Sequence, residues 1–315
     1  FTETMKVYRN LDTLPPFRQA VVTIGTFDGV HLGHQQIIHQ VLKQTEQCGG
    51  ESVLITFNPH PRKVVNPALN LMELTTLEER IILLRQYGVH NLVVVPFTKE
   101  FSELTAEMYI KEFLVAKFHP CTIIIGYDHK FGNRREGDFR LLEQFAPQFG
   151  YQVQEIDEQV IQESIVSSTK IREALMHGVV EKANAYLGHP FFFKGYIIVG
   201  NQLGRTIGFP TANLQINDPG KMVPGNGVYA VTAQLEGETR LLKGMMNIGT
   251  RPTVDGSRRM IEVNLFDFDE DIYGRHLTVW MHHFIRQEQK FSGIESLKEQ
   301  LQSDQQKATG LLQNN

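Results

Sequence analysis

The sequence predicts two domains, an α/β domain built on a parallel sheet and then an antiparallel β-barrel that ends in a helix. Its 315 residues exceed the roughly 100–200 residues of an ordinary single domain. Strand-like and helix-like patterns alternate in the first half, whereas strand follows strand from about Phe191 onward. We place the boundary near residues 182–188 and expect domains at residues 1–184 and 185–315.

The first half contains short apolar, β-branched runs separated by stretches with helical spacing. One of these stretches begins with Thr76 and Glu79, the arrangement of a capping box. Strands separated by helices of this length imply right-handed crossovers and a parallel, doubly wound sheet. We expect strands at 21–25, 52–57, 91–96, 122–126 and 151–156, and helices at 35–47, 76–87 and 105–118.

The second half contains longer strand patterns separated by turn residues, and an antiparallel barrel is the natural closure of such a set. Residues 292–308 carry Ile294, Leu297 and Leu301 on one stripe, which predicts a terminal helix that packs on the barrel. We expect strands at 191–199, 227–235, 239–248, 260–268 and 276–285.

Composition narrows the function classes. The net charge of −4 offers no general attraction to nucleic acid or to an anionic membrane, so small molecules are the expected partners. Cys48 and Cys121 have neither metal-binding nor redox spacing, which fits a reducing cytosol. No apolar run approaches the ~20 residues that span a bilayer, and the first residues lack the layout of a signal peptide. We therefore expect a cytoplasmic protein.

The decapeptide GTFDGVHLGH at 25–34 lies between a predicted strand and a predicted helix. Gly25 and Gly29 permit tight turns and close approach of phosphate oxygens, and the start of a helix favours anions. His31 and His34 are three residues apart, so at the start of that helix both imidazoles can point at one phosphate. The decapeptide therefore predicts a nucleotide phosphate site.

Two other interpretations of this turn stay open. An arbitrary HxxH pair is most often only a solvated helix start, although here the flanking glycines favour the phosphate site. Asp28, His31 and His34 could instead bind a metal, but no obvious fourth ligand is nearby in the sequence.

Three further segments of the first half carry polar or ring-binding groups. TFNPHP at 56–61 follows a strand, and its prolines stiffen a loop where a substrate ring could lodge. In GYDHKFGNRREGD at 126–138, Asp128 could bind a ribose hydroxyl beside several basic side chains. SSTKIREAL at 167–175 is typical of a helix start whose donors suit a triphosphate. Ordinary loops and a simple helix cap are the alternatives.

In the second half, GRTIGFPTAN at 204–213 combines flexible backbone with oxygen ligands. Gly204 and Gly208 can expose amides to a phosphate, while Thr211 and Asn213 face the same side of an extended chain. Such oxygens suit Mg²⁺, which also binds substrate phosphates. The chain has no Walker GxxxxGK[ST] element, so this loop indicates another class of kinase.

A single acidic residue stands out in the strand pattern IEVNLFDF. Because side chains alternate along a strand, Glu262 and Asn264 point to one face and Ile261 and Val263 to the other. Alone, Glu262 would be interpreted as a surface glutamate. Its neighbours GVYAV at 227–231, NIGTRPTV at 247–254 and DIYG at 271–274 change that interpretation.

The first-half motifs resemble the HxGH nucleotidyltransferases, and their GxFDGxHxGH form and order resemble the bacterial FAD synthetases. The resemblance implies a Rossmann-like domain that adenylylates FMN and in which His31 and His34 hold ATP phosphates. His129 stands where the family pattern usually has Phe. The resemblance further implies nucleotide-binding roles for Gly25, Phe27, Asp28, Gly29, Gly33, Asp128, Ser168, Thr169 and Arg172, and flavin-binding roles for Asn58, Pro59 and Phe131.

The second half resembles the riboflavin kinases nearly end to end. The resemblance implies that Glu262 is the general base and that Arg286 contacts the flavin. Asn264 replaces a residue that is often His in this family. The implied phosphate-binding residues are Gly204, Gly208 and Pro210, and the implied Mg²⁺ ligands are Thr211 and Asn213.

Together the two resemblances imply an enzyme of flavin cofactor biosynthesis. It would phosphorylate riboflavin to FMN with ATP, then adenylylate FMN to FAD with release of pyrophosphate, using Mg²⁺. A cytidylyl- or pantetheine-type nucleotidyltransferase could also contain the HxGH turn, but it would not explain the second half. A non-enzymatic flavin or nucleotide sensor is the other alternative, and Glu262 beside Thr211 and Asn213 argues against it.

Overall fold

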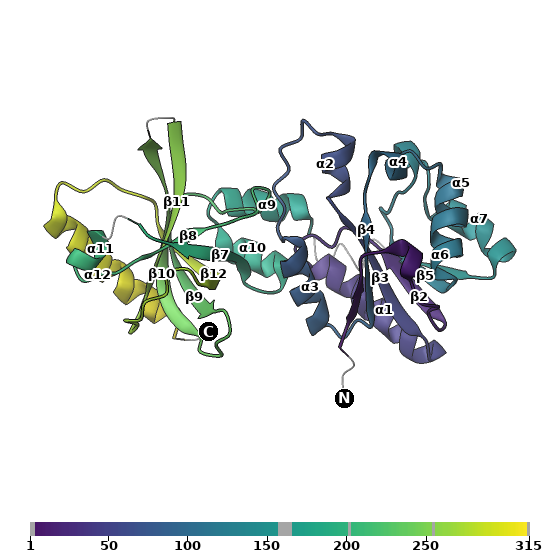
Figure 1. Ribbon diagram of the computed structural model, residues 1–315, viewed down its shortest axis with the longest axis horizontal. Helices are drawn as coiled ribbons and strands as arrows, with labels where there is room; N and C mark the ends of the chain where they lie inside the picture. The colour runs from purple at the N-terminus through teal and green to yellow at the C-terminus, as the bar shows by residue number, and fades with distance from the viewer. Residues whose placement is uncertain (1–3, 157–165, 201–202, 254–255, 314–315) are drawn as a thin grey trace. The chain divides into compact units, whose positions relative to one another are not determined.

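The computed structural model describes residues 4–156, 166–200, 203–253 and 256–313 (Figure 1). The chain divides into two compact units, Phe1–Ser167 and Ser168–Asn315. In this division residues 168–184 fall in the second unit, and the expected domain bounds 1–184 and 185–315 stay a prediction. Among the described residues, no helix is long and apolar enough to cross a membrane.

The first unit is built on a six-stranded parallel sheet with the order β1-β4-β3-β2-β5-β6. The five strands expected here are present, and β1 adds a short strand at one edge. Chain order reverses between β2 and β5, and in sheets of this kind ligands bind at such a switch point, beyond the carboxyl ends of the strands. The strands are β1 (Lys6–Tyr8), β2 (Ala20–Ile24), β3 (Glu51–Asn58), β4 (Asn91–Pro96), β5 (Pro120–Gly126) and β6 (Gln152–Ile156).

Helices cover both faces of this sheet (Figure 1). The expected capping box is present, because Thr76 Oγ1 accepts from Glu79 N at 3.2 Å and Glu79 Oε2 accepts from Thr76 N at 2.9 Å. The helix expected at 105–118 is interrupted by a π-helical stretch, η2, that turns Tyr109 and Phe113 into the core. The helical elements are η1 (Leu11–Thr13), α1 (Leu32–Cys48), α2 (Pro61–Val65), α3 (Leu77–Gln86), α4 (Lys99–Ser102), α5 (Ala106–Met108), η2 (Tyr109–Val115), α6 (Ala116–Phe118), η3 (Asn133–Arg135) and α7 (Phe139–Phe149).

The second unit is a closed antiparallel barrel with the strand order β10-β11-β8-β7-β12-β9, as expected. The terminal helix α12 packs on it, because Ala308 and Leu312, the residue directly after the helix, are fully buried against Ala230 and Met245. The strands are β7 (Phe191–Ile198), β8 (Ala212–Gln215), β9 (Gly227–Leu235), β10 (Leu242–Thr253), β11 (Gly256–Leu265) and β12 (His276–Arg286), and the helices are α9 (Ser168–Met176), α10 (Val180–Leu187), α11 (Leu203–Thr206) and α12 (Ile294–Leu311).

A polar contact explains why α10 belongs to the barrel unit. Asn184 Nδ2 donates to the carbonyl of Met281 on β12 at 2.8 Å, and Asn184 Oδ1 accepts from Phe191 N on β7 at 2.7 Å. One side chain thus bridges two neighbouring barrel strands, while Val180 and Leu187 are buried. Hydrogen bonds and apolar packing together hold α10 on the barrel.

Candidate active sites

The loop after β2 has a strained backbone. Phe27, Gly29 and Val30 have φ angles of 47°, 82° and 42°, in the left-handed region. That region is unfavourable for a β-branched residue such as Val30, whose N–H donates to Phe27 O at 3.0 Å. Strain of this kind accumulates at functional sites, where the surrounding structure holds it in place. The loop therefore presents the start of α1 at the carboxyl edge of the sheet in one fixed conformation.

Asp28 anchors this loop to the segment before α3. Its fully buried carboxylate accepts from Thr75 N at 2.9 Å and from Thr75 Oγ1 at 3.2 Å. Thr75 Oγ1 in turn accepts from Gly29 N at 3.0 Å. The contact positions the loop, and a direct contact between Asp28 and nucleotide stays a prediction. Sequence reasoning missed Thr75, because a threonine beside a capping residue carries no functional signal.

His31 and His34 meet at the start of α1. His31 Nδ1 accepts from His34 N at 3.4 Å, and the two rings stack with centroids 3.7 Å apart. Burial lowers the pKa of His34 well below 6.5, helped by the nearby His31 and Arg80. His34 Nδ1 is shielded from solvent and has no hydrogen-bond partner among the described residues. The site thus offers a neutral imidazole beside a helix N-terminus, where an arriving anion would favour its protonation.

Nothing in the structure supports the metal interpretation of this turn. Across the described ranges, no three His, Cys, Asp or Glu side chains are grouped so that they could hold a metal ion. Asp28 Oδ1 already accepts hydrogen bonds from Thr75.

A buried arginine contributes positive charge near the histidines. Arg80 on α3 is 1% exposed, and its Nη1 donates to Thr56 Oγ1 at 3.1 Å and to Phe57 O at 3.3 Å. Its Nη2 pairs with Glu73 at 3.2 Å, and Glu73 also pairs with Lys63 at 2.6 Å. In the part of the chain described, Arg80 Nε has no acceptor. Sequence reasoning missed Arg80, because helical spacing does not distinguish a buried arginine from a surface one.

Three of the predicted segments meet at the carboxyl edge of the sheet. The parallel strand β2 pairs with β3 through Ile24 and Ile55, and with β5 through Thr23 and Ile124. The three loops that follow these strands therefore lie at the same edge. They contain Gly25, Phe27 and Gly29, the exposed Pro59 and the exposed Asp128, and the exposed Asn58 is the last residue of β3.

The loop after β5 contains two partly shielded rings. Phe131 is buried and stacks on Tyr109 with centroids 5.0 Å apart, so one face of its ring is occupied. His129 lies 6.0 Å from Phe131, and burial lowers the pKa of His129 to about 4, against the opposing effect of Asp128. His129 Nε2 has no partner among the residues described. Flavin binding by Phe131 stays a prediction.

The remaining predicted residues of the adenylyl site lie on two helices. Gly33 is buried in the first turn of α1. Ser168, Thr169 and Arg172 lie near the start of α9, which belongs to the second unit. Their convergence with the histidines of the first unit stays a prediction.

In the barrel, three polar residues form one line across adjacent strands. Glu262 on β11 is directly opposite Asn213 on β8 and Asn247 on β10. Asn213 is 4% exposed, and its Oδ1 lacks a partner among the described residues. A Cβ added at Gly200 would collide with Asn213 Nδ2, so a larger residue there would displace the Asn213 amide. A buried, unpartnered amide oxygen is a suitable ligand for a hard cation.

The loop that leads into β8 is held by its own backbone. The carbonyl of Gly204 accepts from Phe209 N at 2.8 Å and from Ile207 N at 3.2 Å, while Gly208 has a φ of 86°. Asn264 Nδ2 donates to the carbonyl of Pro210 at 2.7 Å. The loop is therefore fixed immediately before Thr211.

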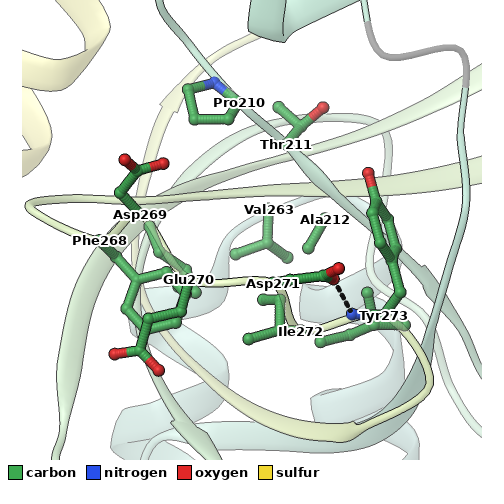
Figure 2. A pocket seen from close by; sticks show the side chains of 12 residues that line it. Pro210, Thr211, Ala212, Val263, Phe268, Asp269, Glu270, Asp271, Ile272 and Tyr273 are labelled. Atoms are coloured by element: carbon green, nitrogen blue, oxygen red, sulfur yellow. Dashed lines mark hydrogen bonds between the residues drawn. The ribbon is translucent and has the colours of Figure 1, made fainter.

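A pocket opens beside Thr211 (Figure 2). Ala212, Val263 and Ile272 give it an apolar centre, and the carboxylate of Asp271 accepts from Tyr273 N at 3.1 Å. The other lining residues are Ile197, Pro210, Leu265, Phe268, Asp269 and Glu270.

Arg286 continues the polar line around the barrel. Val228 on β9 is opposite both Asn247 and Arg286. The guanidinium binds the fully buried carboxylate of Asp304 on α12, with Nε at 2.9 and 3.0 Å and Nη2 at 2.7 Å, and Nη1 donates to Gln287 O at 2.9 Å. Arg286 thus holds α12 on the barrel, and flavin contact through its remaining N–H groups stays a prediction. Sequence reasoning missed Asp304, which has no motif around it.

Comparison with known proteins identifies the family. Residues 15–170 match the family FAD synthetase and residues 187–312 match the family Riboflavin kinase. The chain is 40% identical over 288 residues to the bifunctional riboflavin kinase/FMN adenylyltransferase of Listeria monocytogenes, covering 91% of this chain and 90% of that one. It is 37% identical over 303 residues to the protein of the same name from Escherichia coli, covering 96% of each. The chain belongs to the bifunctional riboflavin kinase/FMN adenylyltransferase family.

A solved structure shows the same fold over almost the whole chain. It is described as a macrolide-efflux protein from Streptococcus pneumoniae, superposes with a TM-score of 0.86 at 30% identity, and is matched over 97% of this chain and 99% of that one.

As a member of this family, the chain phosphorylates riboflavin to FMN and adenylylates FMN to FAD. Its substrates are ATP, riboflavin and FMN. The expected fold class, enzyme class and family are confirmed.

Proposed function

We propose that the barrel's kinase site lies along the line of Asn213, Glu262 and Asn247, with Mg²⁺ held by Thr211 and Asn213. The observation that carries this assignment is the register that places Glu262 opposite Asn213, whose buried Oδ1 has no partner among the described residues. Oxygen donors of this kind match the preference of Mg²⁺. When bound, the ion would neutralise phosphate charge.

Glu262 then acts as the general base for phosphoryl transfer. Its carboxylate accepts the proton of the terminal ribityl hydroxyl as that oxygen bonds to the γ-phosphorus of ATP. The bond between the γ-phosphorus and the bridging oxygen breaks, and ADP leaves. The fixed loop offers the backbone amides of Gly204 and Gly208 to the phosphates. Pro210 has no N–H, and its role at the phosphates is to fix the loop, with its carbonyl accepting from Asn264 Nδ2.

The base of ATP would occupy the pocket beside Thr211. Its centre is apolar, which suits an adenine ring. Asp269, Glu270 and Asp271 at this pocket would repel phosphates, so the triphosphate must point away from them toward Thr211.

In the first unit, a phosphate oxygen of FMN attacks the α-phosphorus of ATP and pyrophosphate leaves. The attacking phosphate is already an anion, so no protein nucleophile is needed. His31, His34 and the start of α1 bind the triphosphate, and the buried Arg80 adds positive charge nearby. Alignment of the two substrates supplies most of the rate.

We also propose that the enzyme works in the cytoplasm and does not bind nucleic acid. Its free cysteines suit a reducing compartment, and its net charge is −4.

The test uses the intact chain with riboflavin, ATP and Mg²⁺, followed by separation of the flavins. Glu262→Gln should abolish FMN formation but leave conversion of supplied FMN to FAD. His31→Ala with His34→Ala should do the reverse and let FMN accumulate. Glu299→Gln removes one negative charge from an exposed position on α12. It serves as the control and should alter neither activity.

Loss of both activities in a folded Glu262→Gln protein would disprove the separate sites. A sensor would bind flavin and ATP without product, and another nucleotidyltransferase would leave riboflavin unphosphorylated.

A further inference from the structure

Glu288, two residues beyond the end of β12, lies over β10 at a position that has no side chain. A Cβ added at Gly249 would collide with Glu288 Oε1, so the carboxylate occupies the space where that side chain would be. Residues two apart in a strand point to the same face, so Gly249 marks the face that carries Asn247. The Glu288 carboxylate is therefore on the face of the proposed kinase site.

The register of β10 and β11 sets the separation between the Glu288 carboxylate and Glu262, the proposed general base. Asn247 is directly opposite Glu262, and Gly249 is one same-face position further along β10. Two residues of a strand span about 7 Å. The carboxylates of Glu262 and Glu288 thus lie on the same face of the barrel, separated by one same-face step along β10.

A network of polar groups orients the Glu288 carboxylate. Asn226 Nδ2 donates to Glu288 Oε2 at 3.1 Å and to Thr250 Oγ1 at 3.0 Å. Asn226 Oδ1 accepts from Arg259 Nη2 at 3.3 Å, which fixes the direction of the amide. A carboxylate can accept about four hydrogen bonds, so Glu288 keeps acceptor capacity after binding Asn226. Glu288 is also an exposed residue, and its carboxylate can be reached by a ligand.

Riboflavin carries donors that match this arrangement. Its ribityl chain is a row of hydroxyl groups that ends in the hydroxyl to be phosphorylated, and its length is comparable to the gap between the two carboxylates. If the terminal hydroxyl meets Glu262, the inner hydroxyls pass along the same face toward Gly249 and Glu288.

We propose that Glu288 binds the inner ribityl hydroxyls of riboflavin and thereby directs the terminal hydroxyl to Glu262. This inference rests on the proposed role of Glu262 as the general base. Glu288 is then a substrate-binding residue that recognises the sugar-alcohol chain and not the ring.

The test measures the kinase reaction as total FMN plus FAD formed by the intact chain. Glu288→Ala should raise the KM for riboflavin about tenfold or more, because hydrogen bonds to a charged group are lost, and leave the KM for ATP unchanged. Glu288→Gln keeps an acceptor for Asn226 and should give a smaller rise in the same direction. Conversion of supplied FMN to FAD reports on the rest of the chain and should not change. Glu299→Ala, exposed on α12, is the matched control.

Lumiflavin separates recognition of the chain from recognition of the ring. It has the same ring but a methyl group in place of the ribityl chain, and it is assayed as a competitor of riboflavin in the kinase reaction. Its inhibition constant should be the same for the wild-type chain and Glu288→Ala.

If Glu288→Ala weakened the binding of lumiflavin and of riboflavin equally, the proposal would be overturned. Such a result would show that Glu288 acts in ring binding or in holding the barrel together. An unchanged KM for riboflavin in both variants would overturn it as well. Failure of the wild-type chain to phosphorylate riboflavin, or full activity of Glu262→Gln, would instead disprove the proposed kinase site.

Discussion

Asp304→Ala should release α12 from the barrel. The Asp304 carboxylate is fully buried, accepts from Arg286 at 2.7 to 3.0 Å and also accepts from Gln300 Nε2 at 2.8 Å. Removing one partner of a buried ion pair costs roughly 3–5 kcal/mol, because the other charge is left uncompensated. The Arg286 side chain is 17% exposed and can gain some hydration. We therefore expect a loss of about 3 kcal/mol, at the lower end of that range.

Urea unfolding measured by tryptophan fluorescence checks this value. Trp280, the one tryptophan of the sequence, lies in β12 and reports on the barrel unit. For an ordinary dependence on urea, a loss of this size lowers the midpoint by about 1–2 M. The control is Glu236→Gln, which removes an exposed partner of Lys194 and should leave the midpoint unchanged.

A midpoint for Asp304→Ala equal to that of the wild type would refute the argument. The double change Arg286→Met with Asp304→Leu removes both charges and should recover much of the loss.

Three further changes test other parts of the structure. Thr75→Val removes a donor to Asp28 and should slow FAD formation from FMN about tenfold with riboflavin phosphorylation intact, and an unchanged rate would exclude the anchoring role. Burial lowers the pKa of His129 from 6.5 to about 4 in the folded protein. As the pH falls, the unfolded chain therefore binds a proton at this histidine before the folded chain does. The free energy of unfolding decreases between pH 6.5 and about 4. His129→Phe should flatten this acid dependence of urea unfolding followed by far-UV circular dichroism, and an unaltered slope would contradict it. Gly200→Ala should collide with Asn213 and abolish FMN formation while sparing FAD formation from FMN, whereas normal kinase activity would show that this close approach is not needed.

Local signals in the sequence predicted most elements, and the differences have physical causes. The apolar run at 91–96 is β4 itself, because a buried parallel strand is defined by hydrophobicity. The strand expected at 239–248 is instead Leu242–Thr253, and the one expected at 260–268 is Gly256–Leu265. In these cases pairing across the β10–β11 hairpin extends the strands through polar residues, and hydrogen bonds rather than burial set their ends.

The sequence by itself determined the two fold classes, the order of the elements and the motifs at 25–34 and 204–213, because periodicity, caps and turn residues act over a few neighbours. The tertiary structure alone decided which distant residues share a site. The line from Asn213 through Glu262 to Arg286 depends on the register of five of the six barrel strands. The burial of Arg80 and the pairing of Asp304 with Arg286 likewise depend on which helix packs where. Contacts between residues far apart in the chain form only when the whole core is assembled, so no local pattern encodes them.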